Sequence, residues 1–110
     1  MKVTFLSISE TEFVEAIDYY NEKSQGLGYE FAAEVKATIH RIIQYPEAWP
    51  SETKNTRKCR CKRFPYSIVF LLKKDKIIIV AVMHLHRKPG YWVNRIESKI
   101  IGQIEERGKQ

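Results

Sequence analysis

The chain has 110 residues, a net charge of +6 and 44% hydrophobic side chains. That length suits one domain, and the apolar content is enough for a packed core, which argues against a disordered chain. The longest apolar run, residues 77–83, is far shorter than the roughly 20 residues of a membrane helix, and the N-terminus lacks the apolar stretch of a signal peptide. We therefore expect a single cytoplasmic domain over residues 1–110 without membrane attachment.

The charge is divided unevenly along the chain. Residues 1–53 carry four basic and nine acidic side chains, a net charge of −5, whereas residues 54–110 carry fifteen basic and four acidic ones, a net charge of +11. A cationic half of this kind favours a nucleic acid, a machine that processes nucleic acid or an acidic protein as the partner. The charge alone does not choose among these three.

The N-terminal half predicts a strand followed by two helices. Residues 2–7 are rich in β-forming side chains and partly alternate. Ser9 with Glu12 three residues later is a capping-box pattern, and apolar residues then recur at helical spacing up to a Gly-Leu-Gly turn at residues 26–28. A second amphipathic helix is predicted over residues 29–44. Two helices joined by a short turn form an antiparallel hairpin, which we expect to cover one face of a sheet.

The C-terminal half predicts three strands and a terminal helix. Residues 56–63 alternate, while residues 66–72 and 77–84 are apolar on both faces, as expected of central strands that are covered at least in part on both sides. Residues 93–106 return to helical spacing. The predicted order is β-α-α-β-β-β-α, an α+β fold in which a helical hairpin packs on a mostly antiparallel sheet.

Two sequence pairs, Cys59 with Cys61 and His84 with His86, raise the question of a metal site. On a strand each pair would share one face, but neither pair supplies enough ligands for a closed zinc site. The cysteines are better explained as small buried apolar residues in a reducing compartment. We expect no metal site and no cofactor, since the sequence also lacks a glycine-rich phosphate loop.

The first candidate surface is a basic run on the strand predicted at residues 56–63. Its cationic side chains are Arg57, Lys58, Arg60, Lys62 and Arg63. On a strand, Lys58, Arg60 and Lys62 would project to one side about 7 Å apart, close to the spacing of successive phosphates. A solvated edge strand whose charges resist aggregation explains the same pattern equally well.

The second candidate surface follows the last predicted strand. Its side chains are His84, His86, Arg87, Lys88 and Tyr91. Histidine transfers protons near neutral pH, arginine holds phosphate, and tyrosine stacks on bases or donates a proton, so the ingredients of ribonucleolytic attack are present. No carboxylate lies near either cluster in the sequence, so a lysine or histidine would have to act as the base. The alternative is structural, with His84 satisfied at a strand end and Tyr91 anchoring the terminal helix.

Several segments together resemble the RelE/ParE superfamily of toxins from type II toxin–antitoxin systems. They are residues 16–20, residues 26–28, Phe31 with Glu34 and Val35, Arg41 and Ile42 before Pro46, Arg63-Phe64-Pro65-Tyr66, and the ending His84-x-His86-Arg87-x-Pro89-x-Tyr91-Trp92. Their order and spacing extend over residues 2–95. The resemblance implies a growth-inhibiting toxin of the plasmid-stabilisation type, neutralised by an antitoxin that wraps it with a helix and an extended segment. The basic half of the chain suits an acidic wrapping partner.

The resemblance also implies alternatives for the target. RelE-like members are ribosome-dependent mRNA endoribonucleases, and ParE-like members inhibit DNA gyrase. The RelE-like pattern has an arginine directly after the aromatic residue that opens the second strand of the meander, whereas Tyr66 is followed here by Ser67. We therefore favour a ParE-like toxin acting on DNA gyrase or related machinery. The alternatives are a RelE-like endoribonuclease acting on ribosome-bound mRNA and an inactive or non-toxic nucleic-acid-binding module.

The candidate residues follow from these alternatives, and whether the protein is an enzyme stays open. Catalytic residues of a nuclease would come from Arg63, Arg87, His84, His86 and Tyr91, and contacts to a nucleic acid or another target from Arg57, Lys58, Arg60, Lys62 and Lys88. Arg63 and Arg87 are the strongest candidates, because each lies in a segment that resembles the superfamily.

Overall fold

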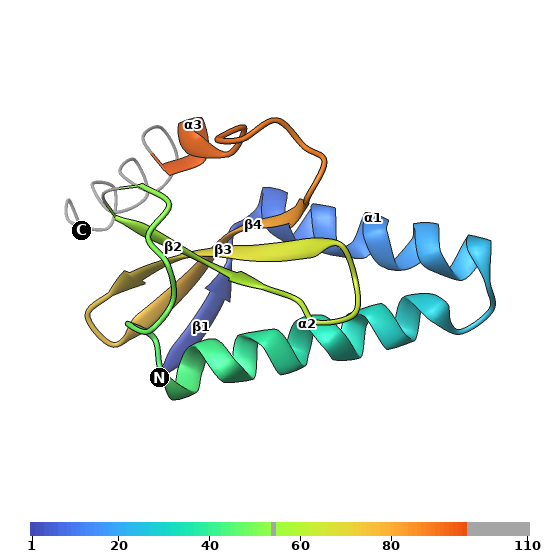
Figure 1. Ribbon diagram of the computed structural model, residues 1–110, viewed down its shortest axis with the longest axis horizontal. Coiled ribbons are helices and arrows are strands. Elements are labelled where there is room, and N and C mark those ends of the chain that lie inside the picture. The colour runs from blue at the N-terminus through green and yellow to red at the C-terminus, as the bar shows by residue number, and fades with distance from the viewer. Residues whose placement is uncertain (54, 97–110) are drawn as a thin grey trace, which may run out of the picture.

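The computed structural model describes residues 1–53 and 55–96. The elements in chain order are β1 (Lys2–Phe5), α1 (Ser7–Lys23), α2 (Leu27–Gln44), β2 (Thr56–Arg60), β3 (Tyr66–Lys73), β4 (Lys76–His84) and the short α3 (Val93–Arg95) (Figure 1). The predicted order and the α+β class are confirmed. Of the helix predicted at residues 93–106, only the part up to residue 96 lies within the described residues. No helix in residues 1–53 and 55–96 is long and apolar enough to cross a membrane.

The four strands form one mixed sheet in the order β1-β4-β3-β2. β2, β3 and β4 are an antiparallel meander, and β1 pairs in parallel with β4. β3 and β4 are therefore central, as their apolar character on both faces predicted. β2 ends at Arg60, earlier than predicted, because the chain turns there: the Cys61 N–H donates to the Tyr66 carbonyl at 2.9 Å.

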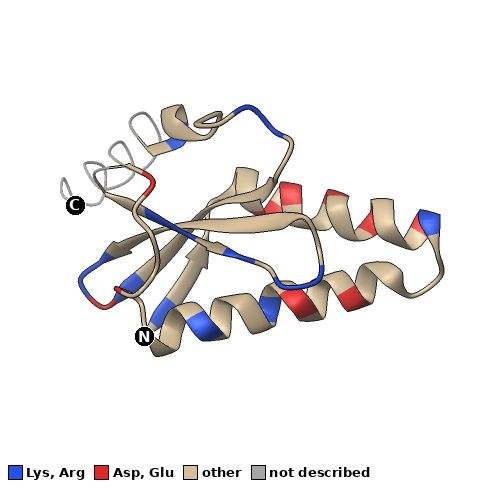
Figure 2. Cartoon of the chain, viewed as in Figure 1, with Lys and Arg blue, Asp and Glu red and all other residues tan. Residues whose placement is uncertain are grey.

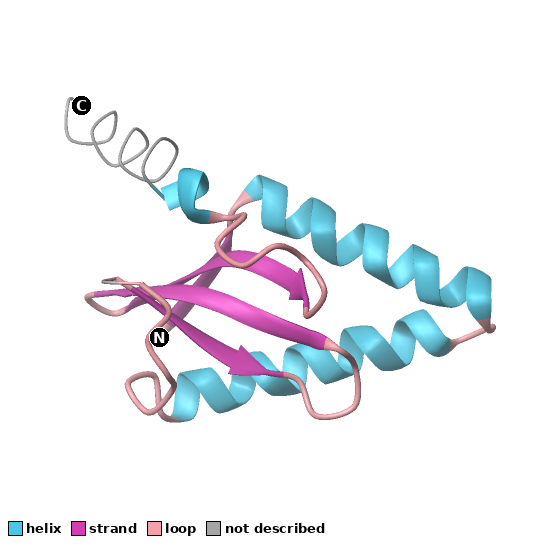
Figure 3. Cartoon of the chain, turned by 45° about the horizontal axis from the view of Figure 1, so that its top comes forward, coloured by secondary structure: helices cyan, strands magenta, loops and turns pink. Residues whose placement is uncertain are grey.

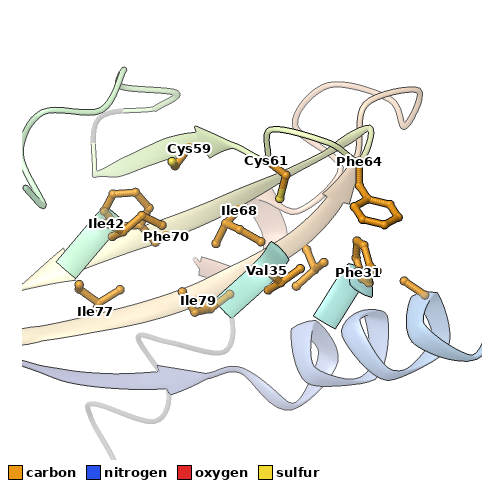
Figure 4. Close-up of a cluster of buried hydrophobic side chains, with 12 residues drawn as sticks. Phe31, Val35, Ile42, Cys59, Cys61, Phe64, Ile68, Phe70, Ile77 and Ile79 are labelled. Atoms are coloured by element: carbon orange, nitrogen blue, oxygen red, sulfur yellow. The ribbon is translucent and has the colours of Figure 1, made fainter. Parts of the chain in front are cut away.

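The helical hairpin covers one face of the sheet, as predicted (Figure 3). Phe31, Val35 and Ile42 on one side of α2 are fully buried, and they pack with Ile68 and Phe70 of β3 (Figure 4). Each such side chain contributes about 1.5–3 kcal/mol through removal from water, so this layer supplies most of the hydrophobic stabilisation.

Cys59 and Cys61 belong to this layer. They are 1% and 3% exposed, and both thiols are free. Burial raises the pKa of both thiols, so they stay protonated at neutral pH. The prediction of two small buried apolar residues is confirmed.

The opposite face of the sheet carries a smaller cluster. It contains Leu6, Val69, Val80 and Met83 together with Trp92, which is only 1% exposed and comes from the segment after β4. The sheet is thus covered in part on its second face too. This packing attaches the segment that leads into α3 to the body of the protein.

Two glycines close the helical hairpin. Gly26 has a φ of +85°, and the N–H of Gly28 donates to the side-chain oxygen of Asn21 at 2.7 Å. A Cβ on Gly28 would lie 2.1 Å from the backbone oxygen of Ile17, so no other residue fits without moving the helices apart. α2 begins at Leu27, slightly before the predicted start.

The capping box predicted at Ser9 and Glu12 is wrong. α1 begins at Ser7, and no side chain caps it. The Ser9 hydroxyl lies 2.8 Å from the carbonyl oxygens of both Leu6 and Ile79, and the Glu12 side chain faces β4. Distant donors outcompete the local cap here, because they include a cation that forms stronger hydrogen bonds with the carboxylate.

Candidate functional site

Two loops meet at one end of the sheet, where β2 and β4 finish. Tyr66 pairs with His84, and the Leu85 N–H donates to the Pro65 carbonyl at 2.9 Å, so loops 61–65 and 85–92 adjoin. Lys and Arg occur in both loops (Figure 2). The exposed cations at this end, which we call the basic end, are Arg60, Lys62, Arg63, Arg87 and Lys88. Residues of both predicted surfaces are therefore neighbours in space.

Arg57 and Lys58 do not join the basic end. Arg57 donates to a backbone carbonyl of the segment before β2 at 2.8 Å, and the Lys58 ammonium lies 2.9 Å from Glu52. Lys58 and Arg60 share one face of β2, but Lys62 lies beyond the end of the strand. The predicted ladder of three evenly spaced cations is therefore wrong, because the chain turns before its third member.

Helix α2 brings carboxylates to the basic end. Glu30 forms an ion pair with Arg63 at 3.1 Å, and Glu34 accepts the backbone N–H of Lys62 at 2.8 Å. The side chains of the Arg63 pair are 63% and 54% exposed, so the pair is weak and a partner can displace it. The expectation that no carboxylate lies near the basic clusters is corrected, since helix packing supplies groups that are distant in sequence.

The most connected polar side chain near this end is Glu12, which is not among the site residues predicted from the sequence. Its carboxylate accepts the Tyr91 hydroxyl at 2.6 Å, the Val82 N–H at 3.1 Å, and two N–H groups of Arg95 at 2.8 and 2.9 Å. Arg95 also donates to the Val80 carbonyl at 3.1 Å. Burial disfavours the charge on Arg95, but hydrogen bonding to Glu12 and its charge outweigh burial and raise the pKa of Arg95. The sequence offered one clue to this role of Glu12: helical spacing places this acidic residue on the inward side of the helix.

Tyr91 lies between this carboxylate and the basic end. The Arg87 guanidinium sits 3.9 Å from the centre of its ring, and that of Arg95 sits 4.9 Å away. Burial, followed by hydrogen bonding to Glu12, raises the pKa of Tyr91 far above its ordinary value. Its hydroxyl proton is thus held by Glu12 and its ring is in contact with two cations, which favours an anchoring role over proton transfer or base stacking.

His84 is held at the end of β4. Its ring contacts Tyr66 edge-on at 5.0 Å, and its Nδ1 accepts the backbone N–H of His86 at 3.0 Å. Burial and the neighbouring His86 lower the pKa of His84, and burial raises the pKa of Tyr66 to about 12. Neutral His84 therefore carries its proton on Nε2, and the lone pair of its Nδ1 is occupied by the His86 N–H. The ring is thus poorly prepared to act as a base. His86 is exposed beside it.

A shallow pocket of about 200 Å³ lies between α1 and the end of β4. It is lined by Glu12, Glu15, Ala16, Tyr19, Tyr66, Val82, His84, Arg87 and Tyr91. Its volume is below the roughly 300–1,000 Å³ of most small-molecule sites, so it suits one side chain better than a cofactor. Within the part of the chain that the structure describes, no three His, Cys, Asp or Glu side chains converge to hold a metal ion. Ser67 is buried, and its hydroxyl has no hydrogen-bond partner among those same residues.

Comparison with known proteins identifies relatives of the chain. Residues 6–89 match the family described as "ParE toxin of type II toxin-antitoxin system, parDE". Among solved structures, the chain is similar to one described as "Chromosomal ParDE TA system from P. aeruginosa", with a TM-score of 0.69 and 17% sequence identity. The match covers 78% of this chain and 97% of the other. At that identity the likeness shows a shared fold. A search of curated protein sequences found no match.

Proposed function

Because the chain belongs to the ParE toxin family of type II toxin–antitoxin systems, we propose that it arrests growth by binding DNA gyrase or related machinery in the cytoplasm through its basic end. The resemblance noted in the sequence is thereby confirmed at the level of the family. The protein is the toxin component of such a system, and its partner is a cognate antitoxin. The identity of the toxin's target is the part that we propose.

The main support is that the basic end offers exposed cations without a prepared acid–base pair. Arg60, Lys62, Arg87 and Lys88 are exposed and form no ion pair with any residue in 1–53 and 55–96. Cations arranged in this way steer and hold an anionic surface. The groups that would transfer protons are occupied: Glu12 by Arg95, Tyr91 by Glu12, and His84 by a backbone N–H. The arrangement therefore favours binding over cleavage.

The same charges support an acidic antitoxin. An acidic extended segment laid across loops 61–65 and 85–92 would neutralise the cations that we assign to the target. Target and antitoxin would then compete for this one surface of the toxin, and neutralisation would follow from its occupancy by the antitoxin. Weak, exposed ion pairs such as Arg63–Glu30 can exchange partners at little cost when the antitoxin binds.

The test is inhibition of DNA supercoiling by purified gyrase. The variant Arg87→Ala/Lys88→Ala removes two charges from the basic end, and Lys2→Ala/Lys73→Ala removes two from the opposite end of the sheet as a matched control. We expect the first variant to inhibit on the order of tenfold less well than wild type, as for truncated interface hot spots, and the control to inhibit like wild type. Equal inhibition by the two variants, or none by the wild type, would contradict the proposal.

The alternative of mRNA cleavage has one specific support, the exposed His86 beside the exposed Arg87. It predicts that ribosome-bound transcripts are cut within minutes of induction and that Arg87→Ala abolishes the cuts. Primer extension on induced cells measures this directly, and intact mRNA at growth arrest argues against a nuclease. Normal growth on overexpression would instead indicate the third possibility, an inactive or non-toxic module.

A further inference from the structure

We infer that Glu12 is a positioning residue that sets the direction of Arg87 at the basic end by holding Tyr91. The residues form a chain of contacts: Glu12 binds the Tyr91 hydroxyl at 2.6 Å, and Arg87 lies 3.9 Å from the centre of the Tyr91 ring. The inference rests on the proposed function only where it treats Arg87 as a contact to the target. The geometric part stands without it.

Side chains close the outer edge of β4 beyond the end of β1. β1 pairs with β4 only as far as Ile79, and beyond that point side chains take the place of a strand. Arg95 donates to the Val80 carbonyl, and Glu12 accepts the Val82 N–H. These are the two backbone groups that one residue of a parallel neighbouring strand would bind. The Glu12–Arg95 pair therefore acts as one residue of a parallel strand, which fixes the Glu12 carboxylate against the sheet.

The Glu12 carboxylate in turn holds Tyr91. The Glu12 and Arg95 side chains are only 15% and 10% exposed, so their ion pair is largely shielded from water. The Tyr91 hydroxyl binds this fixed group, and the next residue, Trp92, is buried under the sheet. The ring of Tyr91 is thus held from its hydroxyl end and from its backbone.

The Tyr91 ring in turn directs the side chain of Arg87. Residues 85–90 contain no helix or strand, and Gly90 with a φ of +76° turns the chain back toward the sheet. Within residues 1–53 and 55–96, Arg87 forms no ion pair, and its guanidinium lies on the Tyr91 ring. The side chain of Arg87 therefore takes its direction from a ring that Glu12 holds.

The outer edge of β2 offers a matched control. Arg41 donates to the Arg60 carbonyl at 3.3 Å, and Glu34 accepts the Lys62 N–H at 2.8 Å. Glu34 and Arg41 are 3.9 Å apart. This second pair also occupies the backbone groups that one residue of a parallel strand would bind. It has no contact with Tyr91, so Glu34→Gln changes a closed sheet edge without changing the support of Arg87.

The geometric test is nuclear magnetic resonance of the Arg87 side chain in the full-length protein. Protons that lie over an aromatic ring resonate upfield, so the Arg87 side-chain protons report their distance from the Tyr91 ring. We expect Glu12→Gln to remove most of this upfield displacement, Tyr91→Phe to remove part of it, and Glu34→Gln to leave it unchanged. An unchanged displacement in Glu12→Gln would overturn the inference. If Glu12→Gln does not fold, Tyr91→Phe decides, because it removes only the hydroxyl that Glu12 holds.

The functional arm repeats the supercoiling assay. We expect Glu12→Gln to inhibit gyrase on the order of tenfold less well, and Glu12→Gln/Arg87→Ala to inhibit no worse than Arg87→Ala alone. If Glu12→Gln loses the upfield displacement while Arg87→Ala inhibits like wild type, the positioning stands and the proposed function fails. If Arg87→Ala is impaired while Glu12→Gln keeps the displacement, the proposed function stands and the inference is wrong.

Discussion

Near the basic end, where β1 no longer covers β4, the outer edges of β4 and β2 are closed by the same kind of pair, but the pairs differ in strength. Glu12 and Arg95 approach within 2.8 Å at the β4 edge, with side chains 15% and 10% exposed. Glu34 and Arg41 remain 3.9 Å apart at the β2 edge, with side chains 12% and 25% exposed. An ion pair with little solvent around it is costly to break, because the remaining charge stays buried without a partner. The β4 edge is therefore the firmer one, and it is the edge that supports Arg87.

The largest expected effect is on the free energy of unfolding, when Glu12 and Glu34 are replaced one at a time with alanine. Glu12→Ala should lower the free energy of unfolding by about 3 kcal/mol, because it leaves Arg95 desolvated and the Val82 N–H unsatisfied. Glu34→Ala should lower it by about 1 kcal/mol, because its ion pair with Arg41 is long and its hydrogen bond to the Lys62 N–H is exposed. Urea unfolding followed by circular dichroism measures both. Equal losses would show that the two edges are equivalent.

Double-mutant cycles sharpen the comparison. For Glu12→Gln with Arg95→Met we expect a coupling energy of about 2 kcal/mol, because both groups share one carboxylate-centred network. For Glu34→Gln with Arg41→Met we expect less than about 0.5 kcal/mol. Each cycle needs four urea curves. A larger coupling at the β2 edge would reverse the ranking of the two pairs.

Salt should separate the pairs further. In roughly 1 M NaCl the Debye length falls to about 3 Å, which weakens exposed pairs far more than shielded ones. The coupling of Glu34 with Arg41 should fall to near zero, while that of Glu12 with Arg95 should change little. The same unfolding cycles at low and high salt provide the measurement, and NaNO₃ in place of NaCl controls for specific anion binding.

The smallest expected effect is a pH dependence confined to the β4 side. The pKa of His84 is lower in the folded protein than in the unfolded chain, so its stabilising contribution is present above the unfolded value and lost as pH falls through the folded one. We expect a small loss of stability as the pH falls below about 6.5, the ordinary pKa of histidine, and His84→Asn should reduce this loss. A similar acid loss in wild type and variant would assign it to other groups.

The sequence predicted the fold well and the site only in outline. Apolar character on both faces identified β3 and β4, and helical spacing with a glycine turn identified the hairpin, because these signals depend on near neighbours. Glu12 was misread as a cap, since its partners Tyr91 and Arg95 come from the other end of the chain. Local spacing contains no information about such pairs.

The exposure of the candidate cations likewise depends on contacts that local spacing does not reveal. Arg63 and Arg87 were selected from segments that resemble the toxin superfamily, and both lie at the basic end. Arg57 and Lys58 belong to the same basic run, yet the segment before β2 binds them. Which cations stay exposed depends on where that segment packs, and its packing is a tertiary property that spacing does not predict.

One of the two tryptophans lies near the outer edge of β2 and the other lies beside β4. Trp49 packs near the β2 edge, 5.9 Å from the Arg41 guanidinium, and Trp92 lies in the cluster beside β4. The chain contains no other indole. Replacing either one with phenylalanine would leave a single tryptophan, which can be excited selectively over the tyrosines, so its emission in each variant would report the opening of one border of the sheet. The protein thus contains its own pair of optical probes, with which the order of events during unfolding can be timed without any added label.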